Sequence, residues 1–178
     1  LAMASCSKDE STGINNGNAI DFRAAMQTRA SETTTANITN FFVTALDKNN
    51  ANYFSDAEFT QDGAFFTSTP AYYWPSDGSN LSFFAYSPSA ADLGATVTIN
   101  STTKTLADFE PATTIADQKD FITATATGSK TDEAAGVALT FGHRLSQIEI
   151  KAKNTNDGYV YKVQGVRIGQ PVSKEIGR

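Results

Sequence analysis

The only cysteine of this chain, Cys6, follows the small residues Ala4 and Ser5 and precedes a polar, charged stretch. A signal peptidase requires small side chains just before its cut, and a thiol at the new N-terminus can carry a diacylglycerol. Each buried methylene contributes about 0.8 kcal/mol, so two or three acyl chains hold a protein on a membrane almost irreversibly. The spacing therefore predicts a lipid attachment site at Cys6, with an incidental free cysteine as the alternative.

The other residue types exclude most catalytic centres. His143 is the only histidine, which rules out a two-histidine metal site and an H-E-x-x-H motif. The sequence also has no G-x-S-x-G elbow, no phosphate-binding loop and no G-x-G-x-x-G fingerprint. A Ser-His-Asp triad that uses His143 stays open, but its place between strand-like runs favours a structural role. We expect no enzymatic activity, no catalytic residue, no metal ligand and no cofactor.

Composition narrows the possible partners. The chain has 178 residues and a formal net charge of −5, with an isoelectric point near 4.8. No basic face is available to replace phosphate counterions, so nucleic acid is not expected as a partner. One cysteine cannot form a disulfide within the chain, so packing must stabilise the fold. Because no run of about 18 apolar residues occurs, membrane attachment depends on Cys6.

The chain divides into a tether and one domain. Residues 1–18 hold the cysteine motif and then Ser, Lys, Asp, Glu, Thr, Gly and Asn, a composition that cannot repay the entropy of ordering. Residues 19–178 contain strand-like patterns, the first of them at residues 19–26, before an exposed Ser/Glu/Thr-rich loop through Thr35. Residues 38–46 are rich in β-formers and are stopped by Asp47-Lys48-Asn49-Asn50.

Eleven of the 19 aromatic residues lie between Tyr53 and Tyr86. Turn signals at Asp62-Gly63, at Thr69-Pro70 and at residues 75–78 divide this segment into short strands. Such a stripe of rings can serve as a sugar-binding platform, through Tyr72 or Trp74 for example. Packing between sheets is the more common use, because each ring buries 150–250 Å² in a typical core.

Several further segments alternate apolar and polar residues. They are residues 95–99, 120–126, 137–141 and 159–163, and changes of parity predict a bulge near residues 143–147 and another at Gly165. No window shows sustained helical spacing with caps. Many short strands separated by turns predict an all-β fold, an antiparallel β-sandwich.

Several segments, in this order behind Cys6, resemble the fimbrillins, the lipoprotein pilin superfamily of Bacteroides and relatives. They are Ala19-Ile20-Asp21-Phe22 with Thr28-Arg29-Ala30, residues 38–45, Tyr72-Tyr73-Trp74-Pro75 with residues 81–88, Asp120-Phe121-Ile122, and residues 138–148. The resemblance implies a transthyretin-like, Greek-key β-sandwich that is the N-terminal domain of a two-domain pilin. A second domain is then expected after Arg178 and is absent from this chain. The acidic residues after Cys6 resemble the tethers of surface-displayed lipoproteins, which implies the outer membrane and cell surface as the location.

The resemblance also implies a route of assembly. In polymerising fimbrillins an arginine-specific protease removes the first strand, and a strand from another pilus subunit fills the groove. Residues 19–28 correspond to that first strand, and Arg29 is the candidate maturation cleavage site, in a polar loop suited to a protease. Arg23 is a second possible site, although it lies within the expected strand.

Two functional hypotheses follow. In the first, the chain is a fimbrial subunit or pilus-associated adhesin that assembles by donor-strand exchange and contacts a host or bacterial surface ligand. In the second, it is a monomeric surface lipoprotein that binds glycan or protein through loops of the sandwich. A small surface hydrolase dependent on His143 is a third, less favoured hypothesis. Because function belongs to the site rather than the fold, the architecture alone does not separate them.

Overall fold

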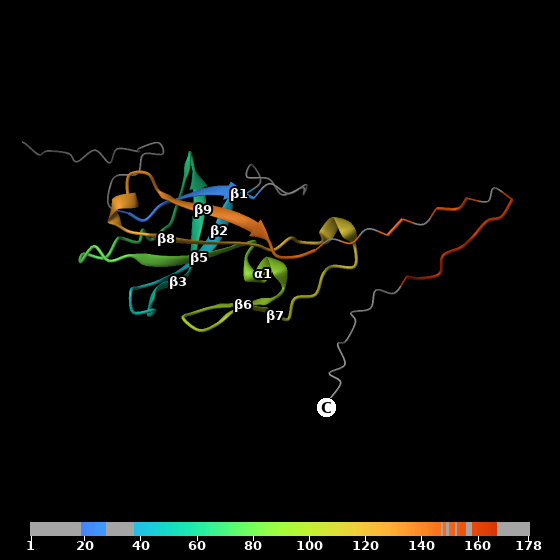
Figure 1. The fold of residues 1–178 in the computed structure, drawn as a ribbon, viewed down its shortest axis with the longest axis horizontal. Coiled ribbons are helices and arrows are strands. Elements are labelled where there is room, and N and C mark those ends of the chain that lie inside the picture. The colour runs from blue at the N-terminus through green and yellow to red at the C-terminus, as the bar shows by residue number, and fades with distance from the viewer. Residues whose placement is uncertain are drawn as a thin grey trace, which may run out of the picture. The chain divides into compact units, whose positions relative to one another are not determined.

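The computed structural model describes residues 19–27, 38–146, 148, 150–151, 153–155 and 158–166. In chain order its main elements, shown in Figure 1, are β1 (Phe22–Met26), β2 (Asn40–Leu46), β3 (Asn52–Asp62), β4 (Phe65–Thr67), β5 (Leu81–Ser87), α1 (Ala90–Leu93), β6 (Thr96–Ile99), β7 (Lys104–Ala107), β8 (Ile122–Gly128) and β9 (Val137–His143). Two single 3₁₀ turns, Ile115–Asp117 and Lys130–Asp132, complete the set. None of the described helices is long or apolar enough to cross a membrane.

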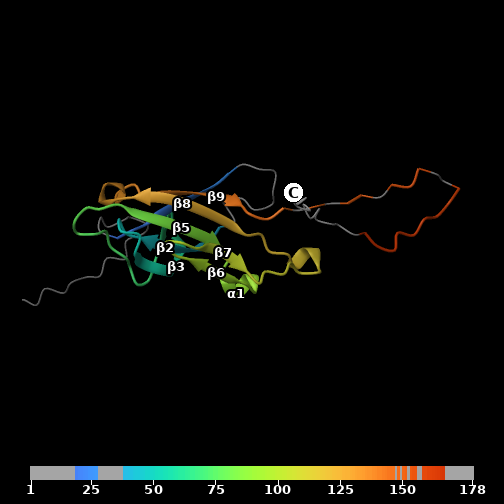
Figure 2. The ribbon, with the colours of Figure 1, turned by 60° about the horizontal axis from the view of Figure 1, so that its bottom comes forward.

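Seven strands form one closed sheet in the order β1-β4-β3-β2-β5-β8-β9, in which β9 pairs back onto β1 (Figures 1 and 2). The expectation of an all-β fold is confirmed. The predicted arrangement was two sheets packed face to face, whereas the strands are hydrogen-bonded into a single barrel. The difference arises at β1, which pairs with β4 on one side and β9 on the other and so leaves neither strand as an open edge.

Several strand predictions agree with the structure. β5 is an example: Leu81, Phe83 and Ala85 point inward and are buried, and the strand ends just before Pro88. The turn expected at Asp62-Gly63 separates β3 from β4, and Gly63 has the positive φ of 61° that such a turn favours. β3 is an unbroken strand of 11 residues that ends at this predicted turn.

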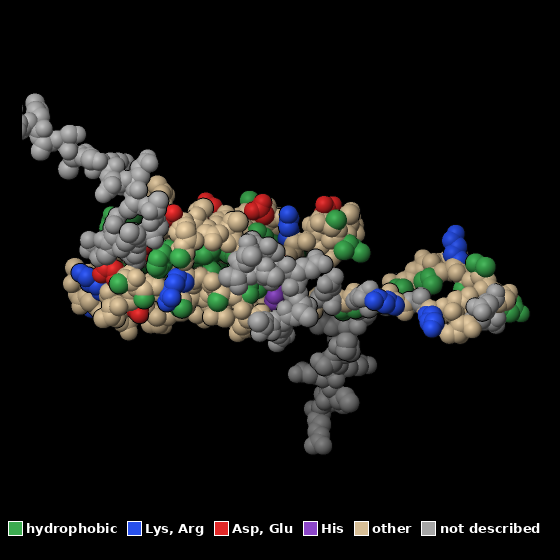
Figure 3. Space-filling view, turned by 90° about the horizontal axis from the view of Figure 1, so that it is seen from above, with side chains coloured by type: hydrophobic (Ala, Val, Ile, Leu, Met, Phe, Trp, Pro, Cys, Tyr) green, Lys and Arg blue, Asp and Glu red, His purple; other side chains and the backbone are tan. Residues whose placement is uncertain are grey.

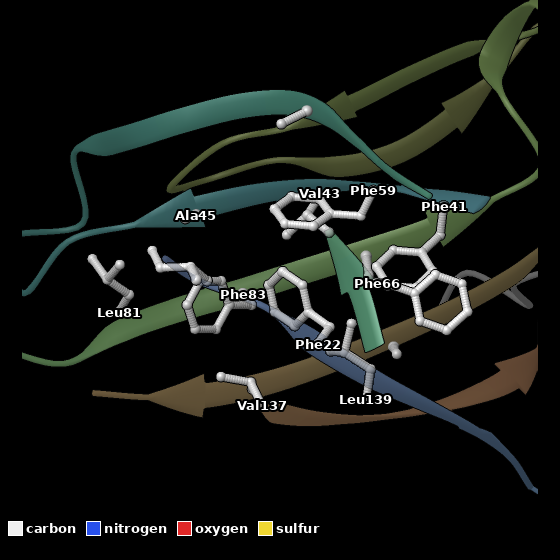
Figure 4. Packing of buried hydrophobic residues seen from close by; sticks show 14 of the residues in the cluster. Phe22, Phe41, Val43, Ala45, Phe59, Phe66, Leu81, Phe83, Val137 and Leu139 are labelled. Carbon is white, nitrogen blue, oxygen red and sulfur yellow. The ribbon is translucent and has the colours of Figure 1, made fainter. Parts of the chain in front are cut away.

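The barrel interior is filled mainly by phenylalanine. The largest fully buried side chains are Phe22, Phe41, Phe59, Phe83, Phe141, Ile20, Leu81, Leu139 and Val43. Figure 4 shows Phe22 among the rings contributed by neighbouring strands. Phe22 meets Phe59 and Phe83 edge to face, an arrangement that aromatic quadrupoles favour, whereas Phe41 and Phe59 are stacked. The prediction that the aromatic stripe is mostly packing is confirmed.

A second layer covers part of the outer face of the barrel. The β6–β7 hairpin and α1 lie beside β5 in Figure 2. Leu93 of α1 packs with Tyr86 and Phe121 in a second buried cluster, against which Val97 and Leu106 of the hairpin are partly buried. Ser89 caps α1 by accepting a hydrogen bond from the Asp92 amide at 3.0 Å.

Residues 147–178 form a separate unit. Its described residues contain no assigned strand, although residues 159–163 were predicted to form one. Ile148, Ile150, Tyr159, Tyr161 and Val163 are all exposed there. The apolar alternation is thus present without a paired strand to cover it among the described residues. The bulges predicted near residues 143–147 and at Gly165 are not formed in the described residues, because β9 ends at His143 and no strand contains Gly165.

Candidate functional site

β1 is the strand that closes the barrel, and it forms more register pairs with β9 than with β4. With β9 it runs parallel over five register pairs, from Phe22 opposite Val137 to Met26 opposite Phe141. With β4 it runs antiparallel at a single register pair, Phe22 opposite Phe66. The two neighbours of β1 do not pair with each other among the described strands, so β1 closes the sheet between them.

Backbone hydrogen bonds extend this hold beyond both ends of β1. The Ile20 amide donates to the Tyr72 carbonyl at 2.8 Å, and the Gln27 amide donates to the Phe141 carbonyl at 2.8 Å. The Val137 amide donates to the Asp21 carbonyl at 2.9 Å. Removing residues 19–27 would therefore leave backbone donors and acceptors on β9 without partners, which is costly unless another strand satisfies them.

The side chains of β1 alternate between the core and the surface. Ile20 and Phe22 are fully buried, Ala24 and Met26 pack against the same cluster, and Arg23 is exposed. The Phe22 ring centroid lies 4.7 Å from that of Phe59 and 5.1 Å from that of Phe83. The inward-pointing side chains thus fill a row of apolar positions inside the barrel (Figure 4). These positions would be empty without β1. We call the place that β1 occupies in the barrel, between β4 and β9, the β1 groove.

Gly136, just before β9, allows the loop to approach β1 closely. Its φ is +68°, and a Cβ atom there would lie 3.0 Å from two ring carbons of Phe65 and 3.4 Å from the Asp21 carbonyl oxygen. Any side chain would therefore add both backbone strain and a steric conflict. The loop that leads into β9 thus helps to cover β1.

We expect Gly136→Ala to lower the free energy of unfolding by about 2 kcal/mol, from the positive φ and the overpacking against Phe65 together. Urea denaturation of the purified variant measures this loss. Gly78→Ala is the matched control, because Gly78 also has a positive φ of 71° but nothing lies within 4 Å of its added Cβ. Equal losses for the two variants would show that the close approach at Gly136 contributes nothing.

Asp21 is a carboxylate inside the site. Only 5% of its surface is exposed, and burial, with the charge of Asp62 as a second cause, raises the pKa of Asp21 to about 6. An ionised carboxylate that is shielded from water destabilises its surroundings. At neutral pH, β1 therefore carries an unfavourable buried charge.

Of the three residues predicted for lipid attachment or cleavage, the structure describes one, Arg23. Cys6 and Arg29 both lie outside the described residues, so the lipid attachment and the cleavage site stay predictions. Arg23 lies within β1, where its backbone is opposite Ala138 of β9. Because a protease binds an unpaired, extended segment, this pairing protects the Arg23 peptide bond while β1 is in place.

His143 is held by a carboxylate. Its Nδ1 atom pairs with the carboxylate of Asp120. This contact joins the end of β9 to the segment just before β8. Its Nε2 atom is buried and has no hydrogen-bond partner within the described ranges. A triad needs a serine hydroxyl at that atom. The geometry thus shows the His–Asp half of such an arrangement, and no described hydroxyl is hydrogen-bonded to Nε2.

The rings considered for glycan binding are mostly covered. Trp74 is only 8% exposed and packs edge to face on Phe83, so the alternative of a glycan platform through Trp74 is not supported. Tyr72 is partly buried and stacks on Phe54 with ring centroids 4.2 Å apart. Tyr73, at 57% exposure, is the open ring of this motif.

Two further observations concern charged side chains in the described part of the chain. It contains no group of three or more His, Cys, Asp or Glu residues that could hold a metal ion. On the face of the protein shown in Figure 3, acidic and basic side chains of described residues are scattered among polar and apolar ones.

Comparison with known proteins identifies the fold. A fimbrial protein from Bacteroides vulgatus superposes with a TM-score of 0.50 at 20% identity, over 71% of this chain and 45% of that one. The fimbrial anchor protein Mfa2 from Porphyromonas gingivalis gives a TM-score of 0.42 at 16% identity, over 71% of this chain and 50% of that one. The matched part of this chain thus spans about half the length of each solved protein. No curated protein matches the chain.

The family comparison covers much more of the sequence. The model of the family described as fimbrillin-like matches residues 28–173. The range begins just after β1, so the match rests on the barrel from β2 onward and on the following unit. Since it takes in most of the chain, the protein belongs to the fimbrillin-like family.

Proposed function

We propose that this protein is a fimbrial subunit or pilus-associated adhesin at the cell surface, and that it assembles by exchange of β1 for a strand of another subunit. The single observation that carries the proposal is the position of β1: it closes the barrel between β4 and β9 and is the first described strand of the chain. Its removal would open the barrel without breaking any other strand pair.

The β1 groove has the properties that strand addition requires. An incoming strand would regain the main-chain hydrogen bonds of β9 and place alternate apolar side chains where Ile20 and Phe22 now lie. Burying each large apolar side chain contributes about 1.5–3 kcal/mol. Affinity would thus come from the backbone pairs, and selectivity from the alternate apolar positions.

Cleavage at Arg29 would link release from the membrane to opening of the groove. Both Cys6 and β1 precede Arg29 in the sequence, so a single cut would separate the lipid anchor and the closing strand from the rest of the barrel. After such a cut only non-covalent contacts would retain β1. The same cut would then both release the subunit from its lipid anchor and make it competent for assembly.

The test is limited digestion of the purified chain with an arginine-specific protease. We expect loss of the segment up to Arg29, followed by a ladder of oligomers that resists mild denaturant. Arg29→Gln should prevent both events, whereas Arg23→Gln should leave both unchanged because β1 protects residue 23. A synthetic peptide of residues 19–27 with Arg23 replaced by Gln, which the protease does not cut, should occupy the groove when added in excess and suppress the ladder. Clean cleavage at Arg29 that yields only stable monomers would overturn the proposal of strand exchange.

A further inference from the structure

Under the β6–β7 hairpin lies a cavity of about 340 Å³, between the hairpin and the outer face of β5 and β8. It is separate from the β1 groove, because β1 contributes none of its lining residues. Its size is at the lower end of the range for pockets that bind small molecules, about 300–1,000 Å³. The cavity shows that the hairpin does not pack fully onto the barrel.

The lining is mainly apolar. Phe84 of β5 and Phe121, just before β8, line the cavity together with Val97, Ile99 and Leu106 of the hairpin. The side chains of the hairpin belong to the second buried cluster and are only partly buried. An apolar body bound between these layers would complete their burial and gain about 25 cal/mol for each Å² removed from water.

Two cations, Lys104 and Arg144, complete the lining, and no Asp or Glu contributes to it. The chain as a whole has the opposite balance, 19 acidic and 14 basic residues. Neither cation forms an ion pair with a carboxylate in the described part of the chain. The positive charge beside the apolar surface is therefore not neutralised by the protein.

The two cations are held in place without being neutralised. The Lys104 Nζ atom lies 4.3 Å from the centroid of the Phe84 ring and donates to the Asn100 carbonyl at 3.2 Å. Arg144 donates from Nε to the Thr123 hydroxyl at 2.5 Å. An ammonium has three donors and a guanidinium five, so both groups keep further N–H capacity for an anion.

From this combination we propose that the cavity, here called the hairpin pocket, binds a small amphipathic carboxylate. The apolar body, aliphatic or aromatic, would lie between the hairpin and the barrel, and the carboxylate would accept hydrogen bonds from Lys104 and Arg144. Charge complementarity selects an anion over a neutral molecule of the same shape. This activity is independent of the proposed role in pilus assembly.

The test measures binding of decanoate and of 1-naphthoate to the full chain by isothermal titration calorimetry, with decanol and acetate as comparison ligands. We expect saturable binding of at least one of the two large carboxylates, at least tenfold tighter than decanol or acetate. The ratio of their affinities shows whether the pocket prefers an aliphatic or an aromatic body. Because these comparisons use the unmodified protein, they do not depend on the folding of any variant.

Variants then locate the site. Lys104→Gln and Arg144→Gln should each weaken binding of the preferred carboxylate about tenfold, since each removes one charged hydrogen-bond donor. Lys130→Gln, which removes a cation outside the hairpin pocket, should leave the affinity unchanged. The proposal is overturned if neither large carboxylate binds, if decanol binds as tightly as decanoate, or if the two pocket variants bind like the control.

Discussion

Replacement of Phe22 by Ala is expected to lower the free energy of unfolding by about 4 kcal/mol, the usual cost of truncating a fully buried phenylalanine. Phe22 has no exposed surface, and its ring contacts those of Phe41, Phe59 and Phe83. The cavity would open at the centre of the barrel, where contributions from β1, β2, β3 and β5 meet. Such a site cannot collapse easily. Urea denaturation followed by circular dichroism measures the change.

Two further variants keep the Phe22 prediction testable. Phe22→Leu should cost only about 1–2 kcal/mol and leave a folded protein if the alanine variant does not fold. Tyr73→Ala removes a ring that is 57% exposed and should cost less than about 1 kcal/mol. A loss for Phe22→Ala as small as that of Tyr73→Ala would mean that β1 contributes little to the core. In cleaved protein, Phe22→Leu should also shorten the time for which the N-terminal fragment is retained.

The second large effect is expected at Asp21. Its pKa is raised from 3.8 to about 6 in the folded protein. Below pH 3.8 the carboxyl is protonated in both the folded and unfolded states, so it then costs nothing. As the pH rises toward 6 the unfolded state ionises first, and the folded state loses up to about 3 kcal/mol relative to it. Asp21 thus leaves stability unchanged in acid and lowers it at neutral pH.

Asp21→Asn should therefore stabilise the protein by up to about 3 kcal/mol at pH 7 and flatten the pH dependence of stability between pH 4 and 6. Urea denaturation at a series of pH values measures both effects. Asp62→Asn is the control, because it removes the second, smaller cause of the raised pKa and should give a smaller gain. If Asp21→Asn lowers stability at pH 7, the buried carboxylate is a favourable hydrogen-bonding group rather than a cost.

The buried charge bears on the proposed function. A closing strand that is destabilised at neutral pH is easier to displace once the chain is cut after it. Asp21→Asn should then retain the cleaved fragment longer and slow oligomer formation at pH 7. The free energy of unfolding would rise and the rate of oligomer formation would fall. This combination is expected only if the buried charge of Asp21 promotes displacement of β1.

Much of the fold could be predicted from local pattern. Residues 38–46 contain β-branched and aromatic residues bounded by polar turns, and β2 occupies nearly all of that range. The first strand was expected at residues 19–26 and forms at Phe22–Met26. β7 was missed because Lys104–Ala107 contains one large apolar side chain, Leu106, and its strand character depends on pairing with β6.

The candidate sites were less predictable, because they depend on contacts between distant segments. Asp21 is a charged residue just before β1, and no local pattern indicates that only 5% of its surface is exposed. The parallel pairing of β1 with β9 follows from closure of the whole sheet, for which no local signal exists. Lys104 and Arg144 are 40 positions apart, and only the packing of the hairpin on the barrel brings them to one cavity.

The direction of β1 has a consequence for any fibre built from this subunit. β1 is parallel to β9 and antiparallel to β4, so a replacement strand that keeps these bonds must enter with the same orientation. Each subunit would insert its donor strand into the β1 groove of the next subunit, which is a head-to-tail contact. Such a contact repeats without closing, unless the rotation between neighbours forms a ring. The resulting filament would be polar, with an exposed groove at one end and a free donor strand at the other. Growth and capping would then be distinct events at opposite ends.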